Sequence, residues 1–138
     1  MQLRIYWRSD KRLISIRKLR KITKEVLVFL FGKKVEKINL EITVVSNKII
    51  KKINFEFLNK NSQTDVICFN YGKYEGEIII SVDEVIKQCK VYNMAPQKEF
   101  LFVLVHGLLH FYGMSDYTEK DKVVMLNRGK KILNKIKI

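Results

Sequence analysis

Helical and strand-like apolar periodicities alternate along this 138-residue chain, and their order is the feature that most constrains its fold. Between residues 37 and 45, apolar Leu40, Ile42 and Val44 alternate with polar neighbours, which is the period-2 pattern of a half-buried strand. We expect further strands near 3–6, 64–71 and 77–80, the last two pairing as neighbours. Helices are expected at 16–31, from a cap at Ser46 or Asn47 to 58, from a cap at Ser81 to 92, from Pro96 to a stop at Gly113, and at 118–136. The order predicts an α+β fold with a mixed sheet of about four strands and about five helices.

Length and cysteine content are typical of an ordinary soluble domain. Residues 1–138 contain no repeat and no Pro/Gly-rich linker, so we expect a single domain. The longest apolar run, residues 100–105, is far shorter than the roughly 18 residues that a membrane span needs. Cys68 and Cys89 are too few for a disulfide framework. These features predict a cytoplasmic protein whose two thiols are reduced and buried.

The net charge of +13 comes from 27 Lys and Arg against 14 Asp and Glu. Such an excess attracts polyanions and favours RNA or DNA as a partner. A second explanation is compositional, because an AT-rich genome drives codons toward lysine, isoleucine and asparagine. Both explanations stay open at the level of the sequence.

A candidate metal site is formed by His106, His110 and Asp116. Two histidines four residues apart on a helix project from one face, so their ring nitrogens can converge on one cation. Gly113 can take the left-handed conformation that ends the helix and returns the chain, which lets Asp116 reach the same cation. Either histidine alone could be a hydrogen-bonded core residue. The set of three instead predicts one Zn²⁺ per chain, with an open fourth position for water.

The residue after the first histidine separates this site from that of a common metalloprotease class. Proteases with an H-E-x-x-H motif have a glutamate there as general base, whereas this chain has Gly107. Peptide hydrolysis by that mechanism is therefore not expected.

Three ordered blocks resemble the YbeY family of rRNA maturation factors. Residues 106–116, HGLLHFYGMSD, resemble the family signature HGxLHxxGYxH, in a subgroup with aspartate as the third ligand and a Thr-Glu helix start. The segment NFEFLN at 54–59 with QTDVICF at 63–69 resembles NxxYR…TDVLSF, and GEIIIS at 76–81 resembles GDIxIS. Together the blocks cover roughly residues 49–121 and are far more specific than the histidines alone.

The resemblance implies a zincin-like fold and a metal-dependent, single-strand-selective endoribonuclease. It also implies roles in maturing the 3′ end of small-subunit rRNA and in ribosome quality control, with rRNA and ribosomal proteins as partners. The family places Thr64 and Asp65 by the cleft, although both could simply start a strand. Cys68 stands where the family has Ser or Thr, which argues against a nucleophilic cysteine.

One departure from the family concerns phosphate binding. The arginine that many members carry near the active site is Leu58 here, and Lys52 or Lys60 could replace it only as point charges. The remaining candidates for holding the RNA backbone are the basic residues of the first helix, Arg17, Arg20, Lys21 and Lys24.

We expect the zinc to lower the pKa of a bound water and to polarise a phosphoryl oxygen. Beyond that water no catalytic group or general base is evident, and the nucleophile could be hydroxide or a ribose 2′-OH. The rival hypothesis is a non-catalytic ribosome-assembly factor with a structural metal, which Leu58 favours.

Overall fold

A computed structural model describes residues 1–59 and 64–136 of the chain. Strands and helices follow one another in α+β order, as the periodicities predicted. Their bounds are β1 Gln2–Trp7, α1 Ile16–Phe31, the 3₁₀ helix η1 Gly32–Lys37, β2 Asn39–Val45, α2 Asn47–Leu58, β3 Val66–Asn70, β4 Glu75–Ser81, α3 Val82–Val91, α4 Pro96–Tyr112 and α5 Glu119–Lys135.

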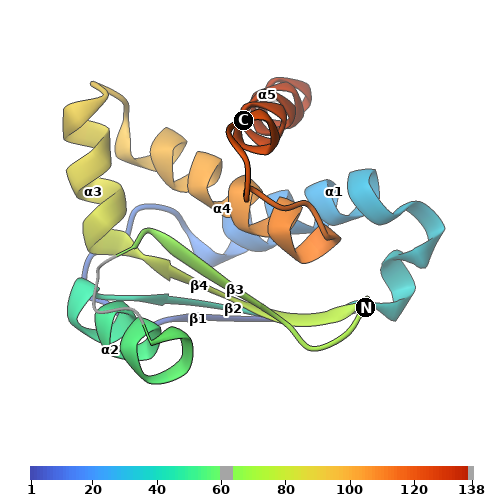
Figure 1. Cartoon of the computed structure of the whole chain (residues 1–138), viewed down its shortest axis with the longest axis horizontal. Helices are drawn as coiled ribbons and strands as arrows, with labels where there is room; N and C mark the ends of the chain where they lie inside the picture. The colour runs from blue at the N-terminus through green and yellow to red at the C-terminus, as the bar shows by residue number, and fades with distance from the viewer. Residues whose placement is uncertain (60–63, 137–138) are drawn as a thin grey trace.

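The four strands form one mixed sheet in the order β1-β2-β4-β3. β1 and β4 flank β2 in parallel, whereas β3 runs antiparallel to β4, so the expected pairing of these two strands is confirmed. Figure 1 shows α4 and α1 on one face of the sheet, α5 beyond α4, and α2 on the opposite face. In this arrangement α4, the most apolar helix, packs directly against the sheet along its middle.

The main core lies between α4, α1 and the central strands. Leu104 and Leu108 of α4 are fully buried together with Ile42 of β2 and Ile78 of β4. A smaller cluster around Ile50 lies under α2 on the other face. The residues of β2 alternate between buried and half-buried, whereas the second half of β4 is buried on both faces. Their buried apolar side chains hold the sheet against α4. None of the described helices is long and apolar enough to cross a bilayer.

Side-chain caps fix several helix starts where the sequence predicted them. Ser46, Ser81 and Thr118 each accept a hydrogen bond from the backbone N–H three residues later. One element was not expected. Residues 32–37 form a 3₁₀ helix that begins at Gly32, which has a φ of 57°, so the second strand begins at Asn39 rather than at 37.

Candidate metal centre and the adjoining cleft

The end of α4 presents two histidines and then reverses the chain. Gly113 caps the helix with a φ of 114°, and its N–H donates to the carbonyl of His110 at 3.0 Å. The N–H of Met114 donates to the carbonyl of Leu109, also at 3.0 Å. A left-handed residue here lets the next residues fold back over the last turn. The backbone therefore returns Asp116 toward the side chains of His106 and His110.

Three ligand atoms gather at this point, as the sequence predicted. The Nε2 atoms of His106 and His110 are 3.2 Å apart. Oδ2 of Asp116 lies 3.5 Å from Nε2 of His110 and 3.9 Å from Nε2 of His106. A tetrahedral zinc with bonds of about 2.0–2.1 Å separates its ligands by roughly 3.3–3.4 Å. The three atoms, which we call the triad, therefore fit three corners of a tetrahedral site.

A contact with the backbone holds the His110 ring in an orientation that suits metal binding. Its Nδ1 lies 3.1 Å from the carbonyl oxygen of Met114, to which a protonated Nδ1 donates. That bond leaves Nε2 unprotonated and directed at the triad, which is the usual arrangement around a metal-binding histidine. Asn70 of β3 donates its side-chain N–H to the carbonyl of His110 at 3.1 Å and ties the helix end to the sheet.

The electrostatic surroundings of His106 favour its neutral imidazole. Burial lowers the pKa of His106, and the neighbouring His110 lowers it further, while Asp65 and Asp116 act in the opposite direction. The histidine side chains are 23% and 24% exposed and that of Asp116 is 43% exposed. The triad is thus open on one side, which suits a site with a free coordination position.

Gly107 has a structural role that the sequence alone did not reveal. A Cβ at this position would lie 3.0 Å from Cγ2 of Val66 and 3.1 Å from Cγ2 of Ile78. Glycine therefore lets α4 pack closely on β3 and β4 just beside the first ligand. The same residue that excludes the protease motif also sets the height of the triad above the sheet.

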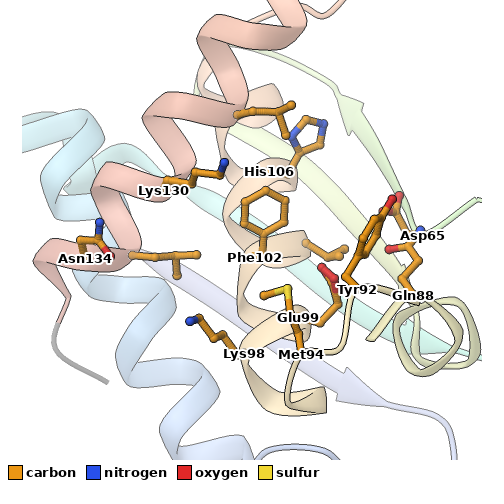
Figure 2. A pocket seen from close by; sticks show the side chains of 13 residues that line it. Asp65, Gln88, Tyr92, Met94, Lys98, Glu99, Phe102, His106, Lys130 and Asn134 are labelled. Carbon is orange, nitrogen blue, oxygen red and sulfur yellow. The ribbon is translucent and has the colours of Figure 1, made fainter. Parts of the chain in front are cut away.

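Two hollows meet at the triad. The groove, of about 630 Å³, is lined by Leu58, Thr64, Cys68, His110, Met114 and Asp116 among others. The cleft, of about 700 Å³, lies between α3, α4 and α5 and is lined by Asp65, Tyr92, Glu99, Phe102, His106 and Lys130 among others. Figure 2 shows the cleft with His106 at one end. Each histidine therefore borders a different hollow.

The residues predicted to contact RNA are separated by the structure. Thr64 lies in the groove and Asp65 in the cleft. Leu58 lines the groove beside the triad. Lys52 is exposed on α2, 4.0 Å from Glu56. Lys60 lies outside the described residues.

The basic residues of α1 lie elsewhere. Arg17, Lys21 and Lys24 are exposed, and none of them borders the groove or the cleft as the structure describes them. Arg20 donates to the carbonyl of Leu3 at 2.6 Å and so also ties α1 to β1. These side chains form a separate basic face and do not belong to the triad.

Cys68 lies in the groove but lacks the features of a nucleophile. Burial raises the pKa of its thiol to about 12, so it stays protonated. Its sulfur lies 3.7 Å from Oδ1 of Asn70. The expectation of buried thiols holds for Cys89, whereas Cys68 is half-buried because one side of β3 faces the groove.

Glu99 is the residue that sequence reasoning missed. It lies seven residues before His106 and lines the cleft, yet it is only 3% exposed. Its Oε2 has no hydrogen-bond partner within residues 1–59 and 64–136. Burial raises the pKa of this carboxyl, and Asp65 raises it further. A glutamate inside an apolar helix, two turns before a ligand on the same face, was the available signal.

Comparison with known proteins gives a consistent result. A family model described as Endoribonuclease YbeY matches residues 4–137. An Endoribonuclease YbeY from Mycoplasmopsis synoviae is 32% identical over 113 residues, covering 75% of this chain and 73% of the relative. Another from Petrotoga mobilis is 34% identical over 125 residues, covering 88% of this chain and 85% of the relative.

A solved structure shares the fold. The solution structure of TM1509 from Thermotoga maritima superposes with a TM-score of 0.70 at 25% sequence identity. The match covers 96% of this chain and 87% of that protein. The likeness therefore extends over the sheet, α4 and the helices around the triad.

Proposed function

The chain belongs to the YbeY endoribonuclease family, and from this premise we propose that it is a zinc-dependent enzyme that cuts single-stranded RNA internally. We propose that its substrate is rRNA, with roles in maturing the 3′ end of small-subunit rRNA and in ribosome quality control in the cytoplasm. The observation that carries the proposal is the triad, whose three ligand atoms all lie within 4.8 Å of one another.

The donor set supports zinc as the metal. Two imidazole nitrogens and one carboxylate oxygen suit a borderline cation, and three protein ligands leave a fourth position open. Bound there, zinc would act as a Lewis acid toward a phosphoryl oxygen and lower the pKa of a water molecule. The protein's own part is to hold the ligands. Met114 fixes His110 through its carbonyl, and Gly113 returns Asp116 to the histidines.

The groove and the basic surface support RNA as the substrate. The chain carries a net charge of +13, so its contacts with RNA phosphates should depend strongly on salt. None of the described residues that line the groove is a lysine or arginine, so a metal bound at the triad would supply positive charge beside the phosphate. We propose that the exposed basic side chains of α1, including Arg17 and Lys21, hold the RNA backbone at a distance from the triad.

The test is a cleavage assay on single-stranded RNA with zinc-loaded protein, with and without a chelator. The matched variant is the double substitution His106→Ala and His110→Ala, checked by circular dichroism. We expect cleavage by the wild type only, its loss with chelator and its return with zinc. Cleavage that survives both chelation and the double substitution would reject the proposal.

The rival, a ribosome-assembly factor with a structural metal, predicts a different pattern. Zinc would be bound at the triad, and its removal would unfold the protein, but no RNA would be cut under any condition. The open side of the triad favours the enzyme, because structural zinc sites are usually closed by four protein ligands. The products distinguish the nucleophiles, since attack by a 2′-OH leaves a cyclic phosphate.

A further inference from the structure

We propose that the cleft between α3, α4 and α5 is a subsite for one unstacked guanine base of the RNA, next to the phosphodiester bond that is cut. The inference deepens the function proposed above and takes single-stranded RNA as the substrate. It assigns a role to Glu99 and to the aromatic walls of the cleft, which the triad does not use.

The position of the cleft fits a nucleotide bound at the triad. His106 borders the cleft at one end, and Glu99 lies seven residues earlier on the same face of α4. Seven residues of helix span about 10 Å. A single nucleotide extends over a similar length from its phosphate to the far edge of its base. A phosphate at the triad would therefore place its own base over Phe102 and toward Glu99.

The walls of the cleft suit the faces of an aromatic base. Phe102 rises from α4 and Tyr92 approaches from the end of α3, and Figure 2 shows both rings bordering the same space. Tyr92 is 65% exposed, so its ring is available to a ligand. Leu126 and Leu133 of α5 complete the apolar lining. Proteins that bind single-stranded RNA hold unstacked bases on such aromatic side chains.

The floor of the cleft selects the edge of the base. The Oε2 atom of Glu99 is buried and has no hydrogen-bond partner in the described parts of the chain. A buried carboxylate without a partner is costly, so a ligand that donates to it gains affinity. Burial and Asp65 favour the protonated carboxyl, whereas a ligand that donates two hydrogen bonds favours the ionised form, which only accepts them. Guanine is the base whose Watson–Crick edge offers two adjacent donors, N1–H and the N2 amino group.

Charge at the rim favours RNA over an apolar protein segment. Lys98 and Lys130 border the cleft and are exposed, so they can contact phosphates on either side of the bound base. A helix or apolar side chain from a protein partner would cover Glu99 without giving its carboxyl a donor. The cleft therefore suits an aromatic ligand with hydrogen-bond donors on its edge better than it suits an apolar ligand.

The experiment measures binding rather than cleavage. Zinc-loaded protein is titrated into fluorescent 2′-O-methyl oligouridylates that carry one central guanine, adenine, cytosine, uracil or abasic site, and a gel confirms that each probe stays intact. We expect the guanine probe to bind about tenfold or more tightly than the uracil and abasic probes, because a two-bond edge contact discriminates bases by roughly that factor or more.

Substitutions assign the preference to the cleft. Glu99→Gln keeps the size of the side chain and should remove the guanine preference, while the exposed control Glu25→Gln should keep it. Phe102→Leu should weaken the binding of every base-containing probe toward that of the abasic probe. If Glu99→Gln fails to fold, the wild-type probe series and Phe102→Leu still show whether the cleft binds a guanine base.

Three outcomes would overturn the subsite. They are equal binding of guanine and abasic probes by the wild type, a preference for another base, and a guanine preference that folded Glu99→Gln retains. Equal binding of the guanine and abasic probes would favour a protein partner as the ligand of the apolar walls. Cleavage of RNA without base preference would reject the subsite alone. Guanine preference without cleavage would reject the enzyme and leave the subsite standing.

Discussion

The triad and the cleft adjoin at His106 but are built in different ways. The triad comes from one helix end and the loop that follows it, so the spacing of a few residues fixes its geometry. The cleft needs α3 and α5 to be packed on either side of α4, and it ends at Asp65 beside β3. The difference shows that local spacing can specify a metal site, whereas a substrate subsite depends on how distant segments assemble.

The two regions also differ in how their polar groups are satisfied. In the triad, the ring of His110 is anchored by a hydrogen bond to the carbonyl of Met114. In the cleft, the carboxyl of Glu99 is buried and its Oε2 lacks a partner among the described residues. The triad suits metal binding, and the cleft suits binding of an RNA base. Substitutions should therefore affect the two separately.

Asp116 should give the largest effect, confined to the triad. Asp116→Ala removes one of three ligands and should lower both zinc affinity and cleavage by a factor on the order of a hundred or more, since even the outer partners of metal ligands change affinity about 10–100-fold. Asp116→His should keep the metal, because imidazole is also a zinc ligand. Zinc content and initial cleavage rates measure both. Full zinc retention in Asp116→Ala would remove this residue from the ligand set.

Gly113 tests whether the triad depends on local backbone conformation. Its φ of 114° is unfavourable for a residue with a side chain, although a Cβ here would meet no atom of the other described residues within 4 Å, its two chain neighbours aside. Gly113→Ala should therefore lower the free energy of unfolding by about 1–3 kcal/mol through backbone strain and weaken zinc binding. Gly72→Ala, which also meets open space, is the matched control and should change neither quantity. Chemical denaturation and zinc titration measure both. An unchanged zinc affinity in Gly113→Ala would contradict the local account.

Glu99 tests the cleft through stability. The pKa of Glu99 is raised in the folded protein by burial and by Asp65, so the folded state holds this proton more tightly than the unfolded state. The resulting stability is fully present below the ordinary pKa of 4.5 and is lost as the pH rises through the raised value. Relative to Glu99→Gln, the wild type should therefore become less stable from acidic to neutral pH, as measured by denaturation at each pH.

The same comparison keeps the two regions apart. Glu99→Gln should leave zinc content unchanged, because the carboxyl does not belong to the triad. A difference in unfolding free energy between wild type and Glu99→Gln that does not vary with pH would show that folding does not raise the pKa of Glu99.

The basic face of α1 should give the smallest effect, outside both regions. Arg17→Gln with Lys21→Gln should reduce the salt dependence of RNA binding, lowering the slope of log K against log salt by about 0.7 for each lost phosphate contact. Zinc content and base preference should not change. Anisotropy across a salt series measures the slope. An unaltered slope would mean that this charge reflects composition rather than RNA binding.

Much of the fold could be predicted because its signals are local. Alternation of apolar residues predicted β2, helical spacing predicted α1, and capping residues such as Ser81 and Thr118 placed helix starts within a residue or two. The triad belongs to the same class of prediction, because a helix with His106 and His110 on one face and a glycine stop leaves little freedom.

The cleft could not be predicted because its signals are spread over the chain. Tyr92, Glu99 and Lys130 carry no shared motif, and only the packing of three helices brings them together. In the sequence, Glu99 is one charged residue in the first turn of a helix, and no local pattern indicates that it is buried.

Zinc content of the folded double variant His106→Ala and His110→Ala tests the central claim most directly. Both side chains are only partly buried, so their loss should leave the core and the circular dichroism spectrum intact. We predict about one zinc per chain in the wild type by elemental analysis, and in the variant no stoichiometric zinc and no RNA cleavage. A folded variant that still holds one zinc per chain, or still cuts RNA at the wild-type rate, would contradict the account.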